Sequence, residues 1–147
     1  MKSQGKKVEI FIRRYSPDDH AEVLNLWLRS FPDDPPWNKP NDIIKRKSRW
    51  QEDLFLIGEK DGIIVAAVLG GYDGFRGWVY HLAVDEMWRG LGIGRQMMTA
   101  IEQRLKELGC PKINLQVRSN NQEVVEFYKH MGYDVEDHTS MGKVLLK

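Results

Sequence analysis

The sequence predicts a single α/β (α+β) domain built on a mixed, mostly antiparallel sheet. Three strand-like runs follow one another through turns, at 54–59, 63–72 and 78–84. The first two are joined by an Asp-Gly pair, which is a strong hairpin signal. A further strand at 113–117 follows an intervening helix, so it is expected to run parallel to 78–84 across a right-handed crossover.

Composition narrows the class of partner. The 147 residues suffice for one domain, and a net charge of +1 gives no indication of nucleic-acid binding. The single cysteine cannot form an internal disulfide, and no apolar run is long enough for a membrane span. We therefore expect a cytoplasmic protein with a small partner, no nucleic acid and no membrane. Residues 1–7 are expected to form a disordered tail before a domain at 8–147.

The N-terminal third shows local signals for two helices. A strand is predicted at 8–13, and Ser16-Pro17 begins a helix that runs to about Arg29. Four prolines between 31 and 40 interrupt regular structure, and a short helix is predicted at 42–50.

The C-terminal half alternates helices and strands. One helical face carries Ile93, Met97, Ile101, Leu105 and Leu108, and Gly109 with Pro111 supplies a stop. A helix is predicted at 121–131, and the sequence favours two closing strands at 133–135 and 144–146.

The stretch WRGLGIGR, residues 88–95, places three glycines immediately before the long helix. A helix N-terminus offers unpaired N–H groups and a partial positive charge, so bare backbone there suits phosphate oxygens. A simple tight turn is the alternative. The dinucleotide fingerprint would require glycine at Arg95, and the nucleotide-triphosphate loop would require an absent Gly-Lys-Ser/Thr ending.

Two motifs carry a resemblance to a known family. Arg89, Gly92 and Gly94 match the Arg/Gln-x-x-Gly-x-Gly/Ala signature of the GNAT superfamily of acetyl-CoA-dependent N-acetyltransferases. The segment NQEVVEFYKHMGY resembles that family's second signature, with Val124 in place of the usual alanine. Within the family the chain resembles the YpeA-type bacterial acetyltransferases.

The resemblance implies a GNAT fold, with helices on both faces of the sheet and a splayed parallel strand pair. It also implies a site for acetyl-CoA, the cosubstrate. Backbone groups of Leu82, Ala83 and Val84 would pair with the pantetheine arm, and Asn121 would contact that arm or cap its helix. The pyrophosphate would bind the loop formed by Arg89, Gly90, Leu91, Gly92, Ile93, Gly94 and Arg95.

Tyr128 is the catalytic residue that the resemblance indicates first, as the acid that protonates the departing thiolate and as a cofactor neighbour. The resemblance gives no equally direct candidate for the base. Relatives that acetylate protein N-termini carry a Glu where this chain has Gln116, which cannot accept a proton. His81 is a candidate base, although a structural histidine is the alternative, and strand alternation would place Tyr80 and His81 on opposite faces.

The expected reaction is direct attack of an amine on the thioester, with neither a metal nor an acyl-cysteine. The acceptor is a primary amine of a small molecule or a protein, selected by residues 31–50. A catalytically weak CoA-sensing or protein-binding module is the alternative function. Homodimerisation stays open.

Overall fold

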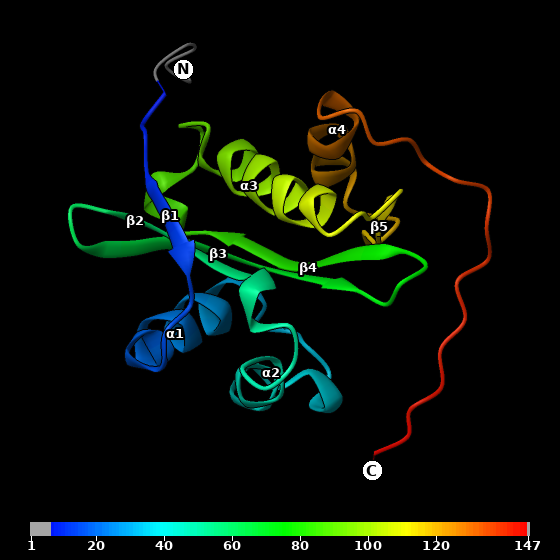
Figure 1. Cartoon of the computed structure of the whole chain (residues 1–147), viewed down its shortest axis with the longest axis horizontal. Coiled ribbons are helices and arrows are strands. Elements are labelled where there is room, and N and C mark those ends of the chain that lie inside the picture. Colours follow the sequence, from blue (N-terminus) through cyan, green and yellow to red (C-terminus); the bar gives the residue numbers. More distant parts are fainter. Residues whose placement is uncertain (1–6, 147) are drawn as a thin grey trace. The chain divides into compact units, whose positions relative to one another are not determined.

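The computed structural model describes residues 7–146 (Figure 1). The chain divides into two units, one ending at Asn114 and the other beginning at Leu115, and each is described by itself. The expected disordered tail, residues 1–7, lies outside the described residues except for Lys7.

A five-stranded sheet has the order β1-β2-β3-β4-β5. Its strands are β1 (Phe11–Arg14), β2 (Phe55–Lys60), β3 (Ile63–Tyr72), β4 (Gly77–Val84) and β5 (Ile113–Leu115). The first three pairings are antiparallel. The Gly77 amide donates to the Lys112 carbonyl at 2.9 Å, so β4 and β5 begin at the same end and run parallel. The prediction of a mixed, mostly antiparallel sheet is confirmed.

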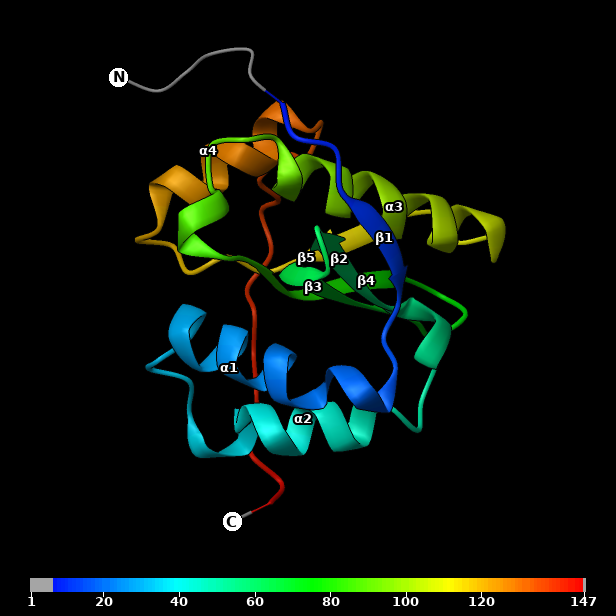
Figure 2. The ribbon, with the colours of Figure 1, turned by 90° about the vertical axis from the view of Figure 1, so that its left-hand side faces the viewer.

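Three α-helices belong to the first unit and cover both faces of its sheet. They are α1 (His20–Ser30), α2 (Pro40–Lys47) and α3 (Ile93–Glu107). Figure 2 shows α1 and α2 beneath the sheet and α3 above it. Short 3-10 turns stand at η1 (Pro17–Asp19), η2 (Pro36–Asn38), η3 (Glu52–Leu54) and η4 (Glu86–Trp88).

Each face of the sheet packs by a different means. On the α1 side, the buried rings of Trp27 and Phe55 stack with centroids 5.6 Å apart. On the α3 side, Gly70 makes room for the helix, since a β-carbon there would lie 2.8 Å from Ile101 Cδ1. Aromatic stacking thus holds α1 against the sheet, and the glycine lets α3 pack close to the strand backbone.

The predicted buried face of α3 is confirmed at Ile93, Met97, Ile101 and Leu105. The fifth position is wrong, because Leu108 is 55% exposed. Leu108 caps the helix, which ends one residue earlier, so its side chain leaves the helical stripe.

The second unit contains α4 (Gln122–His130), close to the helix predicted at 121–131. The two predicted closing strands are wrong: residues 133–135 and 144–146 adopt no strand conformation. Val135 and Leu145 are 74% and 83% exposed. A run of three residues has little preference of its own for a strand, since strand preference arises from packing against paired neighbours.

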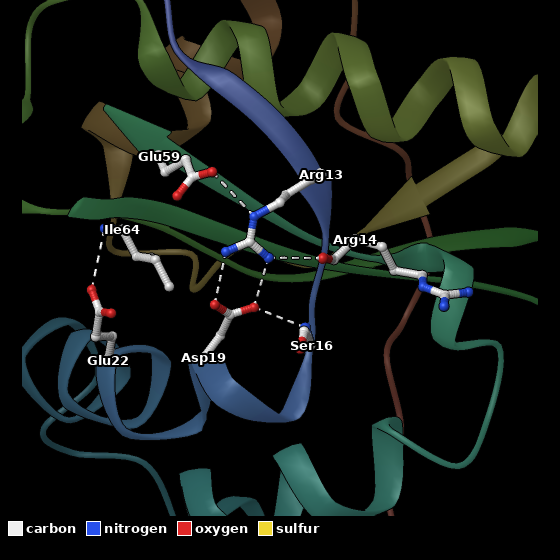
Figure 3. Close-up of polar contacts among 7 residues, drawn as sticks. All are labelled: Arg13, Arg14, Ser16, Asp19, Glu22, Glu59 and Ile64. Carbon is white, nitrogen blue, oxygen red and sulfur yellow. Dashed lines mark hydrogen bonds and ion pairs between the residues drawn. The ribbon is translucent and has the colours of Figure 1, made fainter. Parts of the chain in front are cut away.

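An ion pair ties the start of α1 to the edge of the sheet (Figure 3). Arg13 of β1 donates two hydrogen bonds of 2.8 Å to the Asp19 carboxylate, and its Nε donates to Glu59 of β2 at 3.2 Å. Asp19 is only 5% exposed and also accepts the Ser16 amide at 2.8 Å. The hydrogen bond from Arg13 is the main reason that the Asp19 pKa is lowered.

Replacing Asp19 with Asn is expected to lower the free energy of unfolding by about 2–3 kcal/mol, because the substitution leaves Arg13 without its charged partner. The pKa of Asp19 is lower in the folded chain, so its contribution is complete above about pH 4 and is lost as pH falls through the folded value. Urea unfolding between pH 2 and 7 should show a weaker acid dependence in the variant. Glu52→Gln, at an exposed 3.9 Å pair with Arg14, is the control and should cost under about 0.5 kcal/mol.

Candidate functional site

A β-bulge interrupts β4 near its end. Leu69 of β3 pairs with Tyr80, but Ala67 pairs with Ala83, so His81 and Leu82 both stand opposite Val68. His81 has a φ of 51°, in the left-handed region that side chains other than glycine rarely occupy. The bulge breaks the simple alternation of side chains along this strand.

The bulge corrects the expectation that Tyr80 and His81 face opposite sides of the sheet. The His81 ring lies 5.4 Å from Trp27 of α1 and 4.8 Å from Phe31, which caps that helix. Tyr80 pairs with Leu69, a member of the core on the same α1 side. Both side chains therefore belong to the α1 face.

His81 is paired with an acid that the sequence analysis did not single out. Its Nε2 lies 3.0 Å from Asp34 Oδ2, and the two side chains are 16% and 15% exposed. Asp34 comes from the proline-rich loop after α1, which was expected to select the acceptor. Two adjacent acids in that loop were the available signal, but sequence spacing could not show which residue they would meet.

The end of β4 provides backbone groups that β5 does not reach. β5 begins beside Gly77 and is only three residues long, so it ends before it can pair with Leu82, Ala83 or Val84. One of these groups is already engaged, because Arg89 Nε donates to the Val84 carbonyl at 3.3 Å. Arg89 therefore turns back toward the strand.

The glycine-rich loop needs two of its three glycines for backbone reasons. Gly90 and Gly92 have φ values of 79° and 80°, which side chains disfavour. Gly94 is the second residue of α3 and has no such requirement.

The first turn of α3 can receive an anion. Gly92 is its N-cap and provides no side-chain cap, and the first turn contains no acidic residue. The leading N–H groups and the helix dipole therefore present partial positive charge beside the end of β4.

In the second unit, Asn121 is the N-cap of α4, and its side chain accepts the Val124 amide at 3.4 Å. Its capping role is thus confirmed.

The Tyr128 ring contacts Phe127 and Tyr133, with centroids 5.0 and 5.7 Å apart. Burial raises the pKa of the Tyr128 phenol to about 12. Gln116 donates to Ser140 Oγ at 2.6 Å.

The described residues, 7–146, show neither a metal-binding cluster nor a membrane-spanning helix. Within that range, no three His, Cys, Asp or Glu side chains are grouped so that they could hold a metal ion. No helix there combines the length and apolar character of a membrane span.

Comparisons with known proteins identify the family. A model of the acetyltransferase (GNAT) family matches residues 20–133. The chain belongs to the GNAT acetyltransferase family. An acetyltransferase of Sodalis glossinidius is 41% identical over 139 residues, covering 92% of this chain and 96% of the relative. The match supports an N-acetyltransferase.

Solved structures agree with this fold. Ard1 from Thermoplasma volcanium superposes with a TM-score of 0.79 at 26% identity, covering 88% of this chain and 86% of that one. The aminoglycoside N-acetyltransferase AAC(6')-Iy, solved in complex with CoA, has a TM-score of 0.74 at 14% identity, covering 92% of this chain and 95% of that one. The latter likeness concerns the fold alone.

Gly90→Ala is expected to lower the free energy of unfolding by about 1–2 kcal/mol, because alanine is strained at a positive φ. Nothing lies within 4 Å of a β-carbon at Gly90, so backbone strain is the whole cost. Gly94→Ala is the matched control and should be neutral or stabilising, by up to about 1 kcal/mol, within a helix. Thermal unfolding of both variants measures the difference in stability. Equal losses of stability would contradict the view that Gly90, and not Gly94, is required by its backbone conformation.

Proposed function

We propose that this GNAT protein transfers the acetyl group of acetyl-CoA to a primary amine, through a single catalytic domain at residues 8–147. Acetyl transfer follows from the family. The observation that supports an amine acceptor is the His81–Asp34 pair, with its 3.0 Å contact. An amine with a pKa near 10.4 is unprotonated in only about one molecule in 2,500 at pH 7, so its proton must be removed.

Acetyl-CoA would bind along the end of β4. The pantetheine arm would pair with backbone groups of residues 82–84, which β5 does not cover. Its pyrophosphate would meet the loop of residues 89–95 and the first turn of α3, where N–H groups and the helix dipole favour negative charge. Asn121 is proposed to contact the arm in addition to capping α4.

In the proposed step, His81 takes a proton from the acceptor ammonium and the amine nitrogen attacks the thioester carbon. A neutral His81 that donates Nε2–H to Asp34 has its lone pair on Nδ1, which is then the atom that accepts the proton. The C–N bond forms and the C–S bond breaks, and the electron pair leaves with the CoA sulfur. The nitrogen then releases its second proton, which balances the proton that the departing thiolate gains. Asp34 fixes the ring and balances the charge of the imidazolium.

Tyr128 is proposed as the acid that protonates the departing thiolate. With a pKa raised to about 12, the phenol keeps its proton throughout the neutral range. Because an acid must be protonated to act, burial favours this role. Together with family membership, the paired base and the protonated phenol favour an enzyme over a CoA-sensing module.

The acceptor is proposed to be a small-molecule or protein amine that reaches His81 past residues 31–50. In Asp34 this segment supplies the partner of the base, and it also carries Trp37, which is 49% exposed. The same loop would thus hold the His81 ring and line the path of the acceptor. Acceptor selection and proton removal would then depend on one segment.

His81→Asn tests the base, because asparagine tolerates the left-handed backbone and removes the basic nitrogen. We expect amine-dependent thiol release from acetyl-CoA to fall about 10²- to 10⁴-fold while acetyl-CoA affinity is unchanged. Asp34→Asn should lower kcat by a smaller factor. Asp33→Asn, the adjacent exposed acid, is the control. Unchanged kcat in folded His81→Asn would exclude His81 as the base.

Tyr128→Phe should lower kcat with little change in acetyl-CoA affinity, since only the acid proton is removed. Because the Tyr128 pKa is about 12, the ratio of parent to variant kcat should stay constant up to about pH 10. Stopped-flow or steady-state thiol release across that range measures the ratio. Tyr72→Phe is the control, as its hydroxyl makes only a 3.4 Å contact to the Gly74 carbonyl. A ratio that falls toward one near pH 9 would contradict a raised pKa.

A further inference from the structure

Residues that precede β1 are bound to the glycine-rich loop. The Val8 amide donates to the Leu91 carbonyl at 3.1 Å. This hydrogen bond joins the N-terminal segment to the middle of the loop, between the two glycines that have positive φ. The glycine-rich loop is thus hydrogen-bonded to a segment that precedes it by more than 80 residues in the sequence.

Gln96, in the first turns of α3, holds the same segment through its side chain. Its Nε2 donates to the Val8 carbonyl at 2.7 Å, and its Oε1 accepts the Ile10 amide at 3.2 Å. Nε2 also lies 3.3 Å from the Gly92 carbonyl. One side-chain amide therefore bridges residues 8 and 10 and the N-cap of α3, much as a neighbouring strand would.

Lys7 lies directly over this N-cap. A β-carbon at Gly92 would be 3.5 Å from Lys7 Cγ and 3.8 Å from Cδ. The aliphatic carbons of the lysine side chain therefore pack against this glycine. Lys7 is exposed, and the four-carbon stem of a lysine keeps its ammonium in water while covering the backbone beneath.

We infer that Lys7 is a further phosphate-binding side chain of the acetyl-CoA site, and that Gln96 positions it. The ligand group is the CoA pyrophosphate, which would meet the α3 N-terminus beside Gly92. This inference rests on the proposed function. Lys7 adds a full positive charge to that of Arg95 at a helix start that carries no acidic residue in its first turn.

Gln96 acts through other residues and is therefore a positioning residue. Two of its contacts hold the N-terminal segment at the Val8 carbonyl and the Ile10 amide, and the third reaches the Gly92 carbonyl. The Val8 amide in turn bonds to Leu91. Without the amide, the Val8–Leu91 hydrogen bond would be the contact that still joins residues 7–10 to the loop, among the contacts of the described residues. A cation that is held in place loses less conformational freedom on binding, so positioning should strengthen phosphate affinity.

The test is calorimetric titration of the full chain with acetyl-CoA at low salt. Lys7→Gln is expected to weaken binding about three- to tenfold, with the difference shrinking as salt rises. Lys7→Arg should retain affinity. Lys106→Gln removes an exposed charge from the opposite end of α3 and should have no effect. Gln96→Leu should also weaken binding, whereas Gln103→Leu on the same helix should not.

Truncated donors identify the phosphate. The Lys7→Gln effect should persist with acetyl-3′-dephospho-CoA and vanish with S-acetylpantetheine, which lacks the pyrophosphate.

Equal acetyl-CoA affinity in parent and Lys7→Gln would overturn the inference while leaving the proposed function intact. An effect lost on removing the 3′-phosphate would overturn the pyrophosphate assignment. A folded parent that binds no CoA compound would overturn both proposals. Circular dichroism checks the folding of each variant. If Gln96→Leu does not fold, the affinity of Lys7→Gln alone tests whether Lys7 binds the pyrophosphate.

Discussion

The left-handed backbone at His81 is the constraint on which the site depends. Such a conformation costs about 1–3 kcal/mol in a residue other than glycine, so the surroundings must hold it in place. Trp27 and Phe31 pack on the ring, and Asp34 meets Nε2 at 3.0 Å. The extra residue in β4 then places His81 on the α1 face together with Tyr80, although the two are adjacent in sequence. A regular strand would have sent one of them to the α3 side.

The same strand connects the two halves of the proposed reaction. Beyond the bulge, Asp85 bonds to Val65 through its amide and to Arg29 of α1 through its carboxylate, which fixes where the strand ends. The chain then turns through Gly90 and Gly92 into α3. One short segment therefore sets the position of the proposed base on β4 and of the α3 N-terminus beyond the end of that strand. Movement of that segment would change both acceptor chemistry and cofactor binding.

Local patterns predicted the elements that depend on local physics. The β2–β3 hairpin followed from its Asp-Gly turn, and α3 from a long apolar stripe with a clear stop. The bulge could not be predicted, because it arises from the mismatch between β3 and β4 and leaves no periodic signal. Asp34 was missed for a related reason: its partner is 47 residues away. The prediction of two closing strands was wrong because short runs become strands only when they are paired. The role proposed for Lys7 was not foreseen because its neighbours are polar.

The proposed base also explains why Gln116 need not exclude amine chemistry. A glutamate at that position would accept a proton, whereas the amide of Gln116 donates to Ser140 and cannot. Proton removal requires only that some basic atom lie within reach of the acceptor nitrogen, whichever strand supplies it. The proposed base, His81 on β4, carries such an atom, and its contact with Asp34 orients the ring. Because Asp34 belongs to the loop that is proposed to select the acceptor, a change in acceptor preference through this loop would be expected to alter how the His81 ring is held as well.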